Sequence, residues 1–138
     1  MGTVWDFENL EIWQISRKFV NDIYNIIDNG FFKKDIALIV QLKRAAISIM
    51  SNIAEGFMRY GNKEFIQFLF IARGSIGEVK SHLYIAMDRN YINREQFNIC
   101  ERSIKELLNK VDAFIKYLKS ADYKGIKYKK QLEHIKKT

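Results

Sequence analysis

QLKRAAISIMSNIAEG, the stretch from Gln41 to Gly56, decides the fold of this chain. It contains no proline and shows none of the strict alternation of apolar and polar residues that marks a strand. The apolar residues of this stretch and its flanks recur instead at steps of three and four, which places them on one side of a helix: Ile39, Leu42, Ala46, Ile49, Ile53 and Phe57. We expect that side to face a hydrophobic core.

A second stripe of the same helix is polar. Its members can all donate or accept hydrogen bonds, and they also recur at threes and fours: Gln41, Arg44, Ser48, Asn52, Glu55 and Arg59. A polar group buried without a partner costs about 1 to 3 kcal/mol, so such a stripe requires partners. We interpret it as a hydrogen-bonded network between helices or between subunits. Small residues between the two stripes would let another backbone come close: Ala45, Ser51, Ala54 and Gly56.

The composition predicts one soluble domain. A chain of 138 residues with 48% hydrophobic and 14% aromatic residues can bury a sizeable core. The single cysteine, Cys100, cannot form an internal disulfide, which favours a reducing, cytoplasmic setting. The N-terminal MGTVWDFENL shows no signal sequence, and no stretch approaches the roughly eighteen uncharged apolar residues of a membrane span. We therefore expect no membrane association.

Four periodic segments predict an all-α fold. The absence of proline favours long helices. The first two helices are expected at about Phe7–Ile27 and Asp35–Arg59, with Asp35 supporting the second start. Asn62 is the predicted N-cap of the third helix, and Asn93 with Gln96 resembles a capping box for the fourth. Four long helices joined by short turns predict an antiparallel up-down-up-down four-helix bundle.

The third and fourth segments each carry an apolar seam with regular steps of three and four. The seam residues are Phe65, Leu69, Ala72, Ile76, Val79, Leu83 and Ala86, then Phe97, Cys100, Ile104, Leu107, Val111, Phe114 and Leu118. Gly74 and Gly77 lie in the middle of the third helix, where each glycine costs about 1 kcal/mol unless close packing offsets it. We expect tight packing there, and a left-handed backbone in the turn that ends at Gly30.

Positive charge is concentrated at the C-terminus. Eight lysines and only two acidic residues, Asp122 and Glu133, lie between Lys116 and Thr138, so this part carries +6 of the formal net charge of +7. The remaining chain is almost neutral. We divide the protein accordingly into a bundle, residues 1–121, and a lysine-rich tail, residues 122–138.

The tail has the composition of a phosphate-binding arm. Tyr123 and Tyr128 alternate with lysines and could stack on bases. The expected phosphate contacts are Lys124, Lys127, Lys129, Lys130, Lys136 and Lys137. An ordinary solvated tail that only promotes solubility has the same composition. The alternative contacts on the body are Lys43, Arg44, Arg59 and Arg73.

The stretch QLKRAAISIMSNIAEG, followed by EFIQFLFIARGSIGEVKSHL, resembles the signature of the 23S rRNA-intervening-sequence proteins. This family of four-helix bundles includes the accessory protein of diversity-generating retroelements. The resemblance covers about Leu10 to Ile92, and its most specific parts are SNIAEG with Arg59 and the IA-x-GS segment with Glu78. The chain departs from the family pattern at Met50 and before the second helix, where the family usually has proline.

The resemblance implies a homo-oligomer, and specifically a ring-like pentamer. It also implies a basic surface that engages nucleic acid, and in the retroelement accessory protein a reverse transcriptase as protein partner. An RNA connection is suggested by the location of the intervening-sequence genes inside ribosomal RNA genes.

The chain lacks the patterns of an enzyme or a metal site. Glu55 and Glu78 have no histidine or further acid at a catalytic spacing, so we expect no enzymatic activity and no cofactor. His82 and His134 lie far apart, and Cys100 alone cannot complete a zinc set. Two functions remain open. One is an oligomeric, nucleic-acid-associated bundle that binds RNA or DNA, and the other is a protein-binding or self-assembling scaffold with an incidental basic tail.

Overall fold

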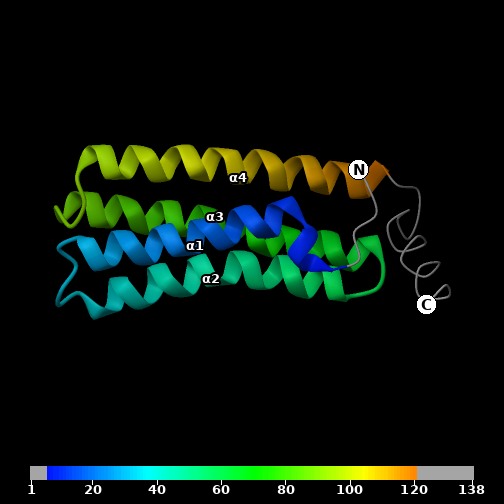
Figure 1. The fold of residues 1–138 in the computed structure, drawn as a ribbon, viewed down its shortest axis with the longest axis horizontal. Coiled ribbons are helices and arrows are strands. Elements are labelled where there is room, and N and C mark those ends of the chain that lie inside the picture. The colour runs from blue at the N-terminus through cyan, green and yellow to red at the C-terminus, as the bar shows by residue number, and fades with distance from the viewer. Residues whose placement is uncertain (1–5, 121–138) are drawn as a thin grey trace.

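A computed structural model describes residues 6–120 as a bundle of helices (Figure 1). A short 3-10 helix, η1, precedes four α-helices, and these residues contain no strand. The elements are η1 (Phe7–Asn9), α1 (Glu11–Asn29), α2 (Ile36–Met58), α3 (Asn62–Asp88) and α4 (Arg94–Ser120). The prediction of an all-helical protein with four long helices is confirmed.

The turns between the helices lie at the two ends of the bundle. Figure 1 shows the α1–α2 and α3–α4 turns at one end and the α2–α3 turn at the other. The two turns at the shared end are joined, because the Phe31 backbone N–H donates to the Tyr91 carbonyl at 3.1 Å. The Tyr91 hydroxyl also donates to Asp35 Oδ2 at 3.0 Å. These bonds fix where α2 begins relative to the end of α3.

The apolar seams predicted for α3 and α4 are buried along their whole length. Every one of the fourteen seam residues lies in the hydrophobic core. In α2 the predicted seam is also buried except for Ile39, which is half-buried against the core. The contacts are most extensive between α2 and α3 and least extensive between α1 and α4. The bundle is therefore tightly closed on one side and more open along the α1–α4 seam.

Two of the three predicted helix starts are confirmed. Asp35 Oδ1 accepts the Leu38 N–H at 3.1 Å, and Asn93 and Gln96 bond each other's backbone N–H reciprocally at 2.8 Å. The prediction that Asn62 caps α3 is wrong. Gly61, with φ of 106°, occupies the cap position, and Asn62 is the first helical residue.

Asn62 has a different role from the predicted one. Its side chain is buried, and its Nδ2 donates to the Leu118 carbonyl at 3.2 Å. The last carbonyls of a helix lack a hydrogen-bond partner within the helix. The Asn62 side chain therefore supplies a partner for a carbonyl at the end of α4, whereas a cap would have bonded an N–H of α3. The side chain thereby fastens the start of α3 to the end of α4.

The glycines act differently from the predictions. Gly30 has an extended backbone, with φ of −97° and ψ of −170°, and not a left-handed one. A side chain there would lie 2.9 Å from the Tyr91 carbonyl, so the position requires glycine because another backbone is close. Gly74 and Gly77 are exposed, and a Cβ on either would meet nothing within 4 Å in this chain. The expected tight packing at these two residues is therefore absent within the described protomer.

By length and composition, α2 could cross a membrane. It is the one helix within residues 6–120 that is long and apolar enough to do so. This corrects the expectation that no stretch approaches a span. The core helix of a bundle can have the same length and composition. α2 also carries Lys43 and Arg44 near its middle and packs against both α1 and α3.

Replacing Gly56 with alanine should destabilise the fold. An added Cβ would lie 2.7 Å from Phe68 Cβ and 2.8 Å from Phe65 Cδ1, and the Phe65 ring is fully buried. We expect a loss of about 1 to 3 kcal/mol in the free energy of unfolding, measured by urea denaturation.

Gly74→Ala is the matched control, because it also lies inside a helix but points into open space. It should leave stability unchanged or raise it by up to about 1 kcal/mol. Equal stability of Gly56→Ala and the wild-type protein would show that α2 and α3 can separate without cost.

Candidate functional site

The polar stripe of α2 meets α3 in a hydrogen-bonded seam. Ser48 Oγ and Ser75 Oγ lie 2.8 Å apart, across the two helices. Asn52 Nδ2 donates to the Ser48 carbonyl at 2.8 Å and to Ser48 Oγ at 3.0 Å. Ser75 is buried, while Ser48 and Asn52 are half-buried. We call these three residues the serine–asparagine centre.

An ion pair extends the seam toward the α1–α2 turn. Arg44 Nη2 donates to Glu78 Oε2 at 2.7 Å and to Gln41 Oε1 at 2.6 Å. The Arg44 side chain is 56% exposed and that of Glu78 is 36% exposed. Water screens such a pair, so its contribution to stability is about 1 kcal/mol or less. The pair fixes the register of α2 against α3 more than it stabilises the fold.

Glu55 and Arg59 lie at the opposite end of the stripe and pair with each other inside α2. Arg59 Nη2 is 3.2 Å from Glu55 Oε1, and both side chains are 52% exposed. The Arg59 guanidinium also lies over the Phe68 ring of α3, 5.3 Å from its centroid. Arg59 contacts α3 through that ring, and neither residue bonds to the serine–asparagine centre.

Glu55 and Glu78 are separated along the bundle. Glu78 pairs with Arg44, which lies eleven residues before Glu55 on α2. At 1.5 Å per residue the backbones of Arg44 and Glu55 lie about 16 Å apart along α2, which places Glu78 far from Glu55. Such a distance exceeds the separation of paired carboxylates in acid–base catalysis.

His82 is half-buried beside the ion pair, and both of its ring nitrogens are buried. Its Nε2 lies 3.5 Å from Glu78 Oε2, close enough for charge attraction but too long for a good hydrogen bond. Neither ring nitrogen has a hydrogen-bond partner among the described residues. Within residues 6–120, no group of three or more histidine, cysteine or acidic side chains is arranged to hold a metal ion.

The basic residues considered on the body are all engaged. Lys43 Nζ lies 4.6 Å from the centroid of the Tyr24 ring, and Arg73 Nε donates to Asp112 Oδ1 at 2.6 Å. That hydrogen bond, followed by the charge of the carboxylate, raises the pKa of Arg73. The six tail lysines, with Tyr123 and Tyr128, lie outside the described residues: Lys124, Lys127, Lys129, Lys130, Lys136 and Lys137.

α2 and α3 also carry exposed apolar residues, which we call the outer stripes. The outer stripes contain exposed aliphatic side chains together with the two open glycines: Val40, Ile47 and Met58 on α2, and Ile71, Gly74, Gly77 and Ile85 on α3. Exposed apolar residues grouped in this way are typical of a protein-binding surface.

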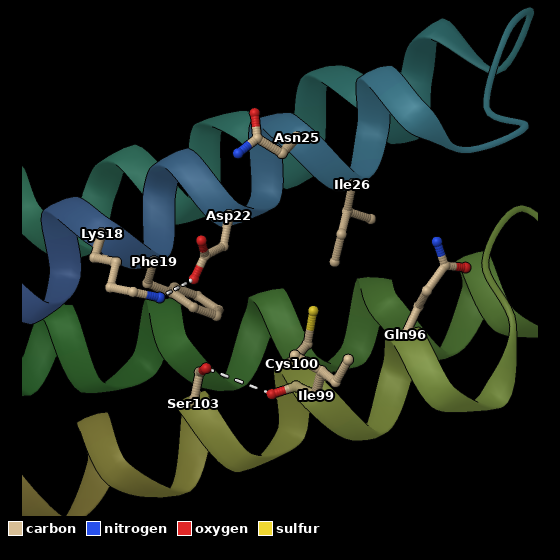
Figure 2. Close-up of a pocket in the computed structure, with 9 residues that line it drawn as sticks. All are labelled: Lys18, Phe19, Asp22, Asn25, Ile26, Gln96, Ile99, Cys100 and Ser103. Atoms are coloured by element: carbon tan, nitrogen blue, oxygen red, sulfur yellow. Dashed lines mark hydrogen bonds and ion pairs between the residues drawn. The ribbon is translucent and has the colours of Figure 1, made fainter.

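A hollow of about 290 Å³ opens between α1 and α4 (Figure 2). Apolar side chains line it, including Phe19, Ile26 and Cys100, and the Lys18–Asp22 ion pair of 3.0 Å lies on its rim. Burial, with the charge of Asp22 as a smaller cause, raises the pKa of the Cys100 thiol to about 11. The thiol is therefore protonated at neutral pH and is not an activated nucleophile.

Comparison with known proteins identifies the family. The model of the 23S rRNA-intervening sequence protein family matches residues 8–113, which include most of α4 as well as α1 to α3. The chain belongs to this family. The match extends beyond the Leu10–Ile92 span that the sequence motifs cover, so the fourth helix is part of the family's domain.

A solved structure shares the fold of this family member. It is a protein of unknown function from the S23 ribosomal protein family of Bacteroides thetaiotaomicron, with 24% sequence identity and a TM-score of 0.69. The similarity covers 76% of this chain and 98% of the other. The chain matches no curated protein.

The family motifs coincide with the α2–α3 contact. SNIAEG contains Asn52 of the serine–asparagine centre, and the GS pair of α3 contains Ser75. The sequence stripe included Ser48 and Asn52 but not Ser75, which lies among the mid-helix glycines. Ser75 could have been found from its spacing, because it lies three residues before Glu78 on α3. Glu78 is the residue that pairs with Arg44 of the stripe.

The two serines should be energetically coupled. In a double-mutant cycle of Ser48→Ala and Ser75→Ala, measured by urea denaturation, we expect a coupling energy of about 0.5 to 1.5 kcal/mol. A cycle on the exposed Glu55 and Arg59, using Glu55→Gln and Arg59→Gln, is the control and should give about 0.5 kcal/mol or less. Additive serine substitutions would contradict the assignment of Ser48 and Ser75 as a structural pair.

Proposed function

We propose that this family member is a non-enzymatic, cytoplasmic protein that self-associates and binds RNA or DNA. In this proposal residues 1–121 form an antiparallel up-down-up-down bundle, and residues 122–138 form the basic tail that contacts nucleic acid. No cofactor takes part. The bundle positions several tails, and the tails supply the affinity.

The distribution of charge carries this proposal. The stretch from Met1 to Ile115 has a formal net charge of only +1, so the excess positive charge lies in the C-terminal part. On the body, Arg44 and Arg73 are paired with carboxylates, and Lys43 and Arg59 lie over aromatic rings. Phosphate contacts by these four residues would have to replace contacts that already exist. The tail lysines outnumber the acidic residues near them in sequence and are the better candidates.

RNA is the first nucleic acid to test. The family is named for sequences that interrupt 23S ribosomal RNA, which supports an RNA connection. Tyr123 and Tyr128 in the tail favour a single strand, since unpaired bases can stack on aromatic rings.

Self-association through the outer stripes of α2 and α3 would multiply this weak binding. The open glycines let a second helix approach closely, and exposed Ile71 and Ile85 beside them supply apolar contact. A ring of five copies, the number that the family resemblance implies, would present five tails to one nucleic acid. Linked weak contacts raise the overall affinity without any new contact.

The same surface supports the second candidate function, a scaffold that binds protein. Its apolar stripes would then take a protein partner, of which a reverse transcriptase is the example given by the family resemblance. The basic tail would be incidental in that case.

Removing the tail should abolish most nucleic-acid binding. We expect the variant lacking residues 123–138 to lose most of its affinity for single-stranded RNA, measured by fluorescence anisotropy over a salt series. For the full chain, six phosphate contacts predict a log–log salt slope of about −4, from roughly −0.7 for each contact.

A variant with the six tail lysines changed to glutamine is the control for chain length. It should bind as weakly as the truncated protein. Undiminished affinity of the truncated protein would move the site to the body, and no binding by either form would favour the protein scaffold.

Gly77→Leu should weaken self-association. The residue is exposed and a side chain there meets nothing in its own chain, so helicity should be unchanged by circular dichroism. Light scattering should show a smaller assembly, because the leucine would overlap a helix packed on α3. Asn109→Leu adds the same side chain to the exposed face of α4 and should leave assembly intact. A wild-type protein that is monomeric at micromolar concentration would refute self-association.

A further inference from the structure

A second hollow lies between α1 and α4, at the end of the bundle where α4 terminates. Its volume is about 330 Å³, and its lining is Leu10, Glu11, Ile12, Lys110, Ala113, Phe114 and Tyr117. Leu10, Ile12 and Phe114 are buried and form an apolar floor, whereas Ala113 is exposed at the rim. We call this the terminal hollow. The hollow can bind a few apolar side chains, because its floor offers no polar group.

The segment that leads into the terminal hollow is acidic: Asp6 and Glu8 precede the lining residue Leu10, and we call these two residues the acidic rim. Asp6, Glu8 and Glu11 lie in six consecutive residues that contain no cation. Lys110 Nζ pairs with Glu11 Oε1 at 3.1 Å, but neither Asp6 nor Glu8 belongs to an ion pair in the described part of the chain. Both are exposed. The rim therefore favours a basic occupant.

The C-terminal segment has the composition and position that this hollow requires. α4 ends at Ser120, three residues after Tyr117 of the lining, and eighteen residues follow. Apolar residues recur among the lysines of this segment: Ile126, Tyr128, Leu132 and Ile135. Gly125 precedes them, and glycine permits a sharp reversal of the chain.

We propose that residues 126–138 fold back onto the terminal hollow, with their apolar side chains on its floor and their lysines beside Asp6 and Glu8. The inference goes beyond the proposed function, because this docking requires no nucleic acid. Where the tail does bind phosphates, the acidic rim competes for the same lysines. The docked tail is then the resting form, and nucleic acid must displace it.

The lengths of the two chain segments agree with this arrangement. Ala113 lies seven residues before the end of α4, and Leu132 lies seven residues after Gly125. In the proposed docked form Gly125 lies level with the end of α4, and a helical return at 1.5 Å per residue then places Leu132 level with Ala113. The two side chains are therefore the pair to join.

Disulfide trapping tests the docking without nucleic acid. In the full chain, Ala113→Cys is combined with Leu132→Cys, and intramolecular disulfide formation under mild oxidation is followed by mass spectrometry. Cys100 is buried and is retained in every variant. The matched control combines Leu132→Cys with Gln67→Cys on the exposed surface of α3.

The control position favours an undocked tail. Gln67 lies one turn before Phe70, whose ring is 5.2 Å from Lys119 Nζ near the end of α4, so a freely moving tail reaches Gln67 at least as easily as Ala113. We expect the Ala113 pair to form its disulfide at least tenfold faster. Equal rates for the two pairs would overturn the proposal. A disulfide-linked dimer as the main product would also overturn it, because a second copy would then be the occupant of the hollow.

The acidic rim provides an independent test. Asp6→Asn with Glu8→Gln should slow trapping of the Ala113 pair severalfold, whereas Asp88→Asn with Glu95→Gln makes the same charge change at the other end of the bundle and should leave the rate unchanged. An equal effect of both double variants would overturn the role of the rim, since it would reflect net charge alone. RNA binding is not needed for either measurement, so failure of the proposed function would not alter these outcomes.

Discussion

The close approach of α2 to α3 is the contact on which the rest of the bundle depends. Gly56 permits it, since any side chain there would collide with Phe65 and Phe68. The helices then lie near enough for Ser48 and Ser75 to bond at 2.8 Å inside the seam. Once α2 and α3 are fixed in this way, their remaining apolar sides form a surface on which α1 and α4 pack. α1 and α4 contact each other less than the other neighbouring helices do, which leaves the α1–α4 seam partly open.

The formal charge of the protein is distributed unevenly between the body and the C-terminal part. On the body, several cations pair with carboxylates or lie over rings, as Arg44 with Glu78 and Arg73 with Asp112 illustrate. Pairs this exposed add little stability, but they neutralise the field around the bundle. The uncompensated charge lies in the C-terminal part. In the proposed function the neutral body supplies the fold and the basic tail attracts the anionic partner.

Two surfaces of the bundle formed by residues 6–120 carry the proposals, and they differ in chemistry. The outer stripes of α2 and α3 are apolar and small, which favours another helix of the same kind. The terminal hollow between α1 and α4 is apolar with an acidic rim, which favours a basic segment. In the two proposals these surfaces take different occupants, a second copy of the chain and the chain's own tail.

Most of the fold could be predicted from the sequence, because helical periodicity is local and the steps of three and four held through Ala86 of α3 and Leu118 of α4. Self-contained caps such as Asn93 with Gln96 were predictable for the same reason. Asn62 was not, because its partner is a carbonyl fifty-six residues away in the chain. The role of a helical glycine could not be predicted from its position in the sequence either, because Gly56 faces two rings and Gly74 faces open space. Sequence determines which residues share a helix face, whereas only the packing of one helix on another decides what that face meets.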